Sequence, residues 1–552
     1  MTQDGKLHGK DLVMKIRHMV LCMLIVICSC HVFAFAGQGL TGAHAADTMM
    51  SQYFKWVKMG KAAIPEIKAA LASKEWREKT HALLAAGQIG DKSLIPEIMD
   101  ILKSDPNRAV KNCAVKALGD LKADVAVPEL IGMLASDTEK QASSGLDQRI
   151  VIEALGKIGD KRATLPLCRL LLSSRNENIR NRTADAIVAI HDKKASSFLL
   201  AQKKRNPDFP YVQAAAIISR IPIKGAEDFI LKMLDSPKPT VKNAAADALL
   251  RVGTDKSIPK LLDAFPGPDL FLRKKIGEAL VAIDSSAAVP QLCDLLKGHD
   301  KKLIMDAANV LSRMDADNIP GIVFERFEKD PGYNAGAAYV LGLKGYDPAI
   351  PVLRKRLKDP AQTGKNEMAE ALGRLGDRDS IPLLISMAAK EMPDGAIGAI
   401  YALGDLKAKD AMPVLLSLLK KQNPKLTGPV IFALGQIGDP AAVRPLIDLY
   451  YGSGLKYQFQ IGLALAQIGG VPVLQFIKDN MDSGNPKRRN MAGFILLKSK
   501  DKNFIPYALS LVDDPDKNIR SYAIGALKNM TGLSYDTAAE WKKWAFRHGY
   551  RG

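Results

Sequence analysis

The sequence is poor in aromatic residues and rich in small aliphatic ones. Only 6% of its 552 residues are Phe, Trp or Tyr, whereas 47% are hydrophobic, with Ala, Leu, Ile and Gly dominating. Side chains of this size suit helices that stack closely on one another. A charged fraction of 25% alongside so much Leu and Ile excludes a disordered chain, because enough apolar surface is present to bury a core.

The sequence also lacks the residue sets of known catalytic and metal sites. Its eight histidines are scattered, and none has a second His or Cys at metal-ligand spacing. Glycine pairs such as those in Gly87-Gln88-Ile89-Gly90 belong to helix ends, so no strand precedes them to form a phosphate loop. No Ser, Thr or Cys occupies a nucleophile elbow. We therefore expect no enzymatic activity, no metal and no cofactor.

Cysteine is too sparse for a disulfide framework. Three of the six cysteines (Cys22, Cys28 and Cys30) lie in an apolar N-terminal segment. The others, Cys113, Cys168 and Cys293, fall in separate predicted helices far apart along the chain. A disulfide requires Cα atoms within about 7 Å of each other. We expect these three to be buried free thiols.

The first 46 residues have the pattern of an export signal. Lys15 and Arg17 precede an apolar run over residues 19–36, and small-residue sites follow at 34–36 and 43–45. A basic start, a short apolar stretch and an Ala-x-Ala exit are typical of a secretory signal peptide. Residues 1–46 are therefore predicted to be a signal peptide or N-terminal anchor, and the protein to be exported, into a bacterial periplasm. The alternative is anchoring in the inner membrane by residues 19–36, since about 18 apolar residues is borderline for spanning; cleavage, and lipidation at Cys30, are left open.

From residue 47 onward the chain repeats itself with a period of about 31 residues. The period is marked by a recurring proline, at Pro65, Pro96, Pro128, Pro166, Pro259, Pro290, Pro320, Pro351, Pro382, Pro413, Pro445, Pro472 and Pro506. The same text returns ahead of it, as in Ala-Leu-Gly-Lys-Ile-Gly-Asp at 154–160 and Ala-Leu-Gly-Gln-Ile-Gly-Asp at 433–439. A repeat of this length predicts one supersecondary unit per period.

Each period is predicted to be a hairpin of two helices. In the first helix, Ala, Leu and Ile recur at three- and four-residue spacing, and a glycine follows where a left-handed C-cap is easiest. Asp or Ser then starts the second helix, with proline in its first turn, where no backbone donor is lost. One such hairpin cannot bury its apolar face alone, so neighbouring hairpins must stack.

These motifs resemble the HEAT-repeat family, in the short form found in phycobilisome-lyase-like proteins, over about residues 50 to 530. The resemblance implies an all-α fold, a right-handed α-α superhelix of the armadillo/HEAT type, with about fifteen helical hairpins over residues 47–530. It does not imply one function. Deoxyhypusine hydroxylases of similar repeats bind iron through His-Glu pairs, and no histidine here is followed by Glu. No residue signature of a bilin lyase is present.

Two irregular segments interrupt the repeat. A polar stretch over residues 136–148 lengthens one unit, and we interpret it as a solvated loop, with partner contact as the alternative. Residues 531–552 follow the last unit and contain Trp541 and Trp544, three residues apart. We predict that this tail caps the apolar face of the last hairpin.

One register of the repeat changes character along the chain. The residue before the recurring Ala-Leu is Lys116, Glu153, Asp185 and Asp247 in N-terminal units, which indicates a solvent-facing position. In C-terminal units the same position holds Tyr339, Tyr401, Phe432 and Phe494, which we name the aromatic stripe. We predict that this stripe binds a protein partner or a second copy. The alternative is that these helices are only better buried.

Cations gather at the turns that join successive hairpins. The strongest clusters are Arg273, Lys274 and Lys275 in one unit and Arg354, Lys355 and Arg356 in another, in a chain of net charge +19. Turns of this kind share one edge of a solenoid, and an edge of this charge attracts polyanions.

The sequence thus predicts a non-enzymatic scaffold for protein-protein interaction outside the cytoplasm. The alternatives are a binder of anionic polymer (polysaccharide or, less favoured, nucleic acid) along the basic edge, and a lyase-type enzyme. Membrane contact is expected only through an uncleaved N-terminal segment. The identity of the partner and the oligomeric state are left open.

Overall fold

A computed structural model describes residues 52–134, 147–203, 208–390, 393–452 and 456–550. These residues form 31 α-helices joined by turns and short 3-10 segments, which confirms the predicted all-α class. The predicted signal segment, residues 1–46, lies outside the described ranges, as does most of the polar insertion at 136–148. Among the described helices, none combines the length and apolarity that a membrane span needs.

The helices alternate between two types, which we name A and B. Most A helices have proline in their first turn; they are α3 (Ile64–Leu71), α5 (Ile95–Ser104), α7 (Val127–Gly132), α10 (Thr164–Ser173), α12 (Lys193–Gln202), α14 (Ala226–Met233), α16 (Ile258–Ala264), α18 (Val289–Asp294), α20 (Ile319–Lys329), α22 (Ile350–Lys358), α24 (Ile381–Ala389), α26 (Met412–Lys421), α28 (Val443–Gly452), α30 (Val471–Met481) and α32 (Ile505–Ser510). The B helices carry the Ala-Leu motif or its equivalent; they are α4 (Trp76–Ile89), α6 (Arg108–Asp120), α9 (Gln148–Ile158), α11 (Glu177–Ile190), α13 (Tyr211–Arg220), α15 (Pro239–Val252), α17 (Leu270–Ile283), α19 (Lys301–Arg313), α21 (Ala335–Leu343), α23 (Lys365–Arg374), α25 (Pro393–Asp405), α27 (Thr427–Ile437), α29 (Gln458–Ile468), α31 (Pro486–Lys498) and α33 (Lys517–Thr531).

Most A helices pair with the B helix that follows them, as α24 does with α25 and α30 with α31. The chain order gives fifteen such pairs, as predicted, and α34 (Ala538–Arg547) follows them alone. The predicted order within a hairpin was wrong, because the Ala-Leu helix was placed first and the proline helix second. The reason is that an A helix packs mainly on the B helix that follows it, whereas a B helix makes much less contact with the A helix that follows its corner.

The corner between hairpins is built from the residues that the sequence suggested. Gly438 ends α27 in the left-handed conformation, at φ +71°. Asp439 then caps a 3-10 turn by accepting a hydrogen bond from the amide of Ala441, at 2.9 Å. At an equivalent corner His191 takes the left-handed position, at φ +56°.

The glycine of the Ala-Leu-Gly motif has a role that the sequence did not reveal. A Cβ atom at Gly373 would lie 2.6 Å from Cα of Ala402 in the next B helix, and one at Gly404 would lie 2.9 Å from Cα of Ala433. Only a hydrogen atom fits at such a distance. Successive B helices therefore pack backbone to backbone through a glycine-alanine ladder, which sets their separation.

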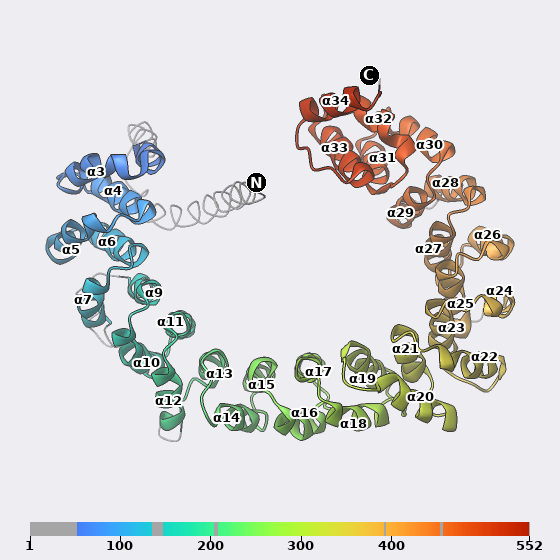
Figure 1. The fold of residues 1–552 in the computed structure, drawn as a ribbon, viewed down its shortest axis with the longest axis horizontal. Helices are drawn as coiled ribbons and strands as arrows, with labels where there is room; N and C mark the ends of the chain where they lie inside the picture. Colours follow the sequence, from blue (N-terminus) through green and yellow to red (C-terminus); the bar gives the residue numbers. More distant parts are fainter. Residues whose placement is uncertain (1–51, 135–146, 204–207, 391–392, 453–455, 551–552) are drawn as a thin grey trace. The chain divides into compact units, whose positions relative to one another are not determined.

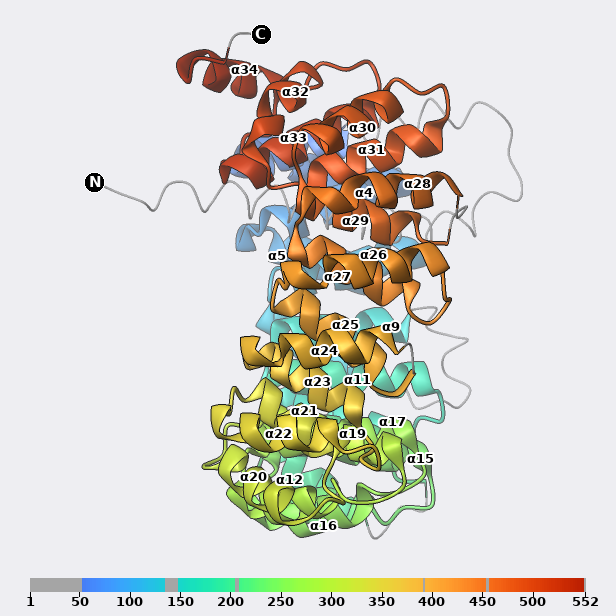
Figure 2. The same cartoon turned by 90° about the vertical axis from the view of Figure 1, so that its right-hand side faces the viewer.

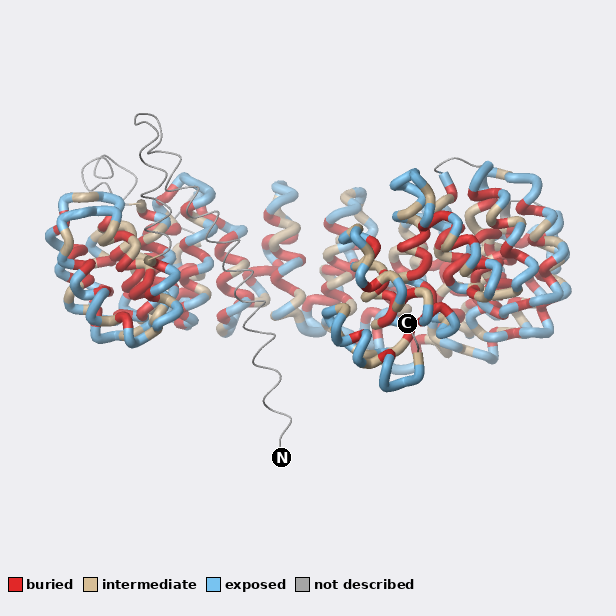
Figure 3. The backbone as a smooth tube through the Cα atoms, turned by 90° about the horizontal axis from the view of Figure 1, so that it is seen from above, coloured by how far each residue is buried: buried red, intermediate tan, exposed pale blue. Residues whose placement is uncertain are grey.

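The chain falls into two compact units, divided between Phe229 and Ile230. Within each unit the B helices form one closely packed layer and the A helices a second (Figure 1). Seen from the side, the helix ends of the second unit form two edges (Figure 2). We name them the turn edge, which carries the A-to-B turns, and the corner edge, which carries the B-to-A corners. Buried residues follow the helices, and exposed ones gather at these edges (Figure 3).

The C-terminal tail buries one of its two tryptophans, and the repeats contain three cysteines. Trp541 of α34 is fully buried, and its indole nitrogen donates to the carbonyl of Tyr535 at 3.2 Å. Trp544 instead stacks on His548 within the tail. Cys113, Cys168 and Cys293 are free thiols, as predicted, although Cys113 is only half-buried. Burial raises the pKa of Cys168 to about 12 and that of Cys293 to about 11, so both stay protonated at neutral pH.

Candidate protein-interaction surface

The four residues of the aromatic stripe lie on B helices of the second unit, on α21, α25, α27 and α31. Phe432 is 41% exposed, and Tyr339, Tyr401 and Phe494 are half-buried. On either side of each ring in sequence, residues such as Ile400 and Ala433 are buried in the core. The stripe therefore lies on the side of the B-helix layer that faces away from the A helices, and part of each ring is open to solvent.

Tyr401 and Phe432 form the centre of the stripe. Their rings are in edge-to-face contact, with centroids 5.4 Å apart and an interplanar angle of 67°. They come from α25 and α27, which the glycine-alanine ladder brings together. Burial, followed by the charge of Glu370, raises the pKa of the Tyr401 hydroxyl, which therefore stays neutral at physiological pH.

Tyr339 is not brought against Tyr401, because α23 lies between their helices. The α23 side chains Glu370 and Arg374 form an ion pair at 2.8 Å. The Arg374 guanidinium also lies 5.5 Å from the ring centroid of Tyr339. The stripe is thus interrupted by one ion pair, whose arginine is itself stacked on an aromatic ring.

Phe494 packs on an aromatic residue that the sequence reading missed. The ring of Phe459 lies 4.9 Å from that of Phe494, and Phe459 is 58% exposed. A signal for it was present, since Phe459 precedes Leu463, the α29 residue in the stripe register, by four residues. Residues four apart lie on one helix face.

The centre of this surface carries no charge. Helices α27 and α29 contain no charged residue, and their Gln436 and Gln467 side chains hydrogen-bond to each other at 3.0 Å. Asp405 and Glu370 border it, and burial raises the pKa of both carboxyl groups despite the charge of Arg374. The surface is therefore apolar in its middle and weakly acidic toward α23 and α25.

The basic-edge prediction is wrong for Arg273. This side chain is only 4% exposed, and it lies against the turn that precedes its own helix. It donates to the carbonyl of Gly267 at 2.9 Å and forms an ion pair with Asp306 at 3.1 Å. The guanidinium supplies hydrogen-bond donors to turn carbonyls, because these carbonyls have no donor within a helix.

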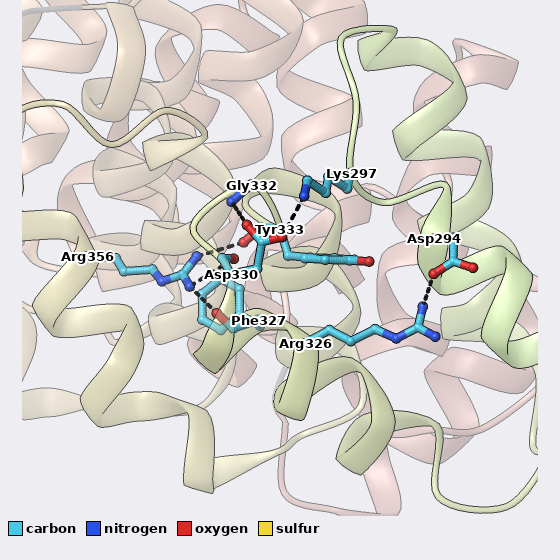
Figure 4. Close-up of polar contacts among 8 residues, drawn as sticks. All are labelled: Asp294, Lys297, Arg326, Phe327, Asp330, Gly332, Tyr333 and Arg356. Carbon is cyan, nitrogen blue, oxygen red and sulfur yellow. Dashed lines mark hydrogen bonds and ion pairs between the residues drawn. The ribbon is translucent and has the colours of Figure 1, made fainter.

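The prediction is also wrong for Arg356, which is 8% exposed. Figure 4 shows its guanidinium directed at the turn that follows α20. Its guanidinium donates to the carbonyls of Tyr333, at 2.7 Å, and Asp330, at 3.2 Å, and also to that of Phe327. It lies 4.1 Å from the ring centroid of Phe327. Lys297 holds the same turn from the other side, through Asp330 at 2.7 Å. Arg356 thus fastens the turn between α20 and α21.

The remaining basic-edge residues are divided. Arg354 forms ion pairs with Asp377, which is buried, and with Asp379 at 3.1 Å. Its charge is therefore paired at the corner between α23 and α24. Lys275 pairs with Asp247. Lys274 and Lys355 are exposed. Two of the six predicted cations are therefore freely available to a polyanion.

Other kinds of site were sought in the described residues. No group of three or more His, Cys, Asp or Glu side chains there could hold a metal ion. A hollow of about 270 Å³ lies between α7 and α10 of the first unit, lined by Ile131, Leu134, Pro166, Arg169, Leu170 and Ser173. It is formed by A helices of the first unit, whereas the stripe belongs to the second unit.

Several solved structures resemble this chain at low sequence identity. Importin beta, crystallised in a polyethylene glycol condition, is 14% identical, with a TM-score of 0.43 over 88% of this chain and 77% of its own. The CpcE-CpcF complex of phycocyanin lyase from Nostoc sp. PCC7120 is 22% identical, with a TM-score of 0.25 over 45% of this chain and 92% of its own. Human deoxyhypusine hydroxylase is 19% identical, with a TM-score of 0.23 over 50% and 96%. No function is transferred from these structures.

A search among curated protein sequences finds no match. The family model for HEAT repeats matches residues 64–144, 139–219, 202–280, 324–395 and 388–454. These matches cover more than half of the chain and include the helices that carry Tyr339 and Tyr401. The protein belongs to the HEAT-repeat family.

Proposed function

We propose that this protein is a non-enzymatic scaffold that binds a protein partner on the B-helix surface of its second unit. The observation that carries the proposal is the Tyr401–Phe432 pair. It stays partly exposed at a register where other repeats of the chain place charged residues. An aromatic pair that stays partly exposed beside an uncharged surface fits a contact surface.

The geometry suits binding without rearrangement. Each ring is fixed by a neighbouring ring or cation, so little side-chain entropy is lost when a partner covers it. Aromatic residues of this kind, set in a packed apolar surface, commonly supply most of the affinity of an interface.

Binding of an anionic polymer along the basic edge has weaker support. Arg273 and Arg356 are buried, and Arg354 is paired with two aspartates. The exposed cations Lys274 and Lys355 belong to different repeats. A continuous polyanion track would require the cations that the turns and corners use internally.

We further propose that the scaffold acts outside the cytoplasm, on the basis of the signal-type pattern of residues 1–46. Fractionation of bacterial cells, followed by mass spectrometry of the N-terminal peptide, tests this. A mature chain that starts near residue 37 or 46 in the periplasmic fraction supports export. An intact N-terminus in the cytoplasmic fraction contradicts it.

The binding role is tested by affinity purification of a tagged chain from the cell envelope. Y401A/F432A is expected to lose the co-purified protein, because it removes the central pair. F271A/F546A is the matched control, since it removes two rings that are 61% and 87% exposed and lie elsewhere. Equal recovery of the partner with both variants would contradict the proposal.

A further inference from the structure

Three lysines occupy one register of three successive repeats beside the stripe. Lys425, Lys456 and Lys487 are 31 residues apart, and each precedes the stripe register of its B helix by seven residues. All three are exposed, at the N-terminal ends of α27, α29 and α31. We name them the lysine column, and it lies on the turn edge, because the three residues lie at the A-to-B turns.

In the described part of the chain, these lysines make none of the turn hydrogen bonds that the arginines make, although Lys456 lies 4.9 Å from the ring centroid of Tyr457. None of the three makes an ion pair with a residue that the structure describes. Nearby carboxylates have other partners, since Asp448 pairs with Arg444 at 3.0 Å and Asp479 accepts from Gln475 at 2.7 Å. Asp482 is the exposed acidic residue at these turns. The column therefore keeps a net positive field.

We propose that the partner presents an acidic, extended segment to the lysine column and an aromatic or apolar residue to the stripe. This inference rests on the proposed function. Charge complementarity selects an acidic segment. The adjacent rings of Phe432, Phe459 and Phe494 select an apolar residue next to it. The occupant is thus a polypeptide of mixed acidic and aromatic character, and not a uniform polyanion.

The spacing of the column defines the sequence of that segment. Packed helices lie about 8–10 Å apart, so the three lysines repeat at about that distance. A polyproline II segment has three residues per turn and rises about 3.1 Å per residue, so every third side chain returns to the same side after about 9 Å. Acidic residues at positions i, i+3 and i+6 would therefore meet the three lysines in order.

The test measures binding of labelled synthetic peptides to the full chain by fluorescence anisotropy. The probe has four Glu-Pro-Pro units followed by Phe-Ala-Phe. One control peptide has the same composition with its glutamates grouped together, and another has Lys in place of Glu. We expect the spaced peptide to bind most tightly and to weaken in high salt.

Charge reversal locates the binding. K425E/K456E/K487E should weaken the spaced peptide about tenfold or more, because three exposed ion pairs are lost. K409E/K500E/K502E makes the same charge change at exposed lysines of the corner edge and should leave binding within about twofold.

Several results would overturn the inference. One is an equal loss of peptide affinity in both triple variants, and another is no binding of the spaced peptide. A third is binding of the grouped or the lysine peptide that is as tight as that of the spaced peptide or tighter. The last is binding of heparin or of phosphatidylglycerol vesicles that is as tight as that of the spaced peptide. A different result would contradict the proposed function, namely that Y401A/F432A still retains the cellular partner. Loss of that partner with Y401A/F432A but not with K425E/K456E/K487E sinks only this inference.

Discussion

Arginines near the start of the B helices hold the turns that precede them. Arg180 donates to the carbonyl of Ser174 at 2.5 Å, Arg489 to that of Ser483 at 2.6 Å, and Arg520 to that of Pro515 at 2.9 Å. Arg273 does the same at its own turn. These carbonyls would otherwise be short of donors near the ends of A helices. Part of the +19 charge is therefore structural, and net charge alone overstates the affinity for polyanions.

Replacing Arg356 with alanine should destabilise the second unit. The carbonyls of Phe327 in α20 and of Asp330 and Tyr333 in the turn after it would lose a buried donor, at a cost of about 1–3 kcal/mol. K355A makes the same charge change at the neighbouring exposed residue and should cost less than about 0.5 kcal/mol. Thermal unfolding followed by circular dichroism, with hydrogen exchange at residues 330–334, measures both. An unchanged melting temperature and unchanged exchange in R356A would refute the clamp.

Glu370 should make stability depend on pH. Burial raises the pKa of its carboxyl group in the folded protein, against the opposing charge of Arg374. Ionisation of Glu370 therefore destabilises the folded state. This destabilisation is absent below the unfolded pKa of about 4.3 and fully present above the folded pKa. E370Q should melt at a higher temperature than the parent at pH 7 and at the same temperature near pH 3.

The control for this titration is E328Q, which changes an exposed glutamate of α20. It should leave the melting temperature nearly unchanged at both pH values. A lower melting temperature of E370Q at pH 7 would show that the ion pair with Arg374 outweighs burial, contrary to our account.

At the scale of elements, the glycine-alanine ladder decides how closely the B helices pack. It recurs between α21 and α23, through Gly342 and Ala371, and between α27 and α29, through Gly435 and Ala464. The A helices are joined to one another by far weaker packing. Because the ladder joins α25 to α27, it also brings Tyr401 into contact with Phe432. The binding surface is therefore a product of the ladder.

Gly373→Ala should destabilise the stack of α23 on α25. The added methyl group would lie 2.8 Å from Cβ of Ala402, so the helices must separate, at a cost of about 1–3 kcal/mol. Gly452→Ala is the control, because no atom lies within 4 Å of the added carbon and alanine favours a helix. Melting temperatures should fall for G373A and hold or rise for G452A. Equal melting temperatures for the two variants would argue against the ladder.

The repeat, its period and its corners could be predicted from sequence because proline, glycine and aspartate act locally. The order of helices within a hairpin could not, since the pattern of one period does not show which neighbour a helix packs on. The burial of Arg273 and Arg356 was also hidden, because turn carbonyls have no signature in the sequence. The stripe could be predicted from the register, whereas Phe459 lies one turn away from that register and was missed.

At the scale of the molecule, function is expected to be a property of several repeats together. Each pair of helices packs mainly on its neighbouring pairs, so each repeat adds one equivalent residue to a surface that several repeats share. The second unit holds the whole aromatic stripe and the lysine column, and α34 follows its last pair. No single repeat contains the proposed site.

The most direct test of the account is in-cell photo-crosslinking with a photoreactive residue placed at Phe432 or, as a control, at Asn309. Both positions share the same register, and both are exposed. We predict that one protein is recovered repeatedly with the residue at Phe432 and is not recovered with it at Asn309. No protein crosslinked at Phe432, or the same proteins at both positions, would contradict the claim that the aromatic stripe is the partner-binding surface.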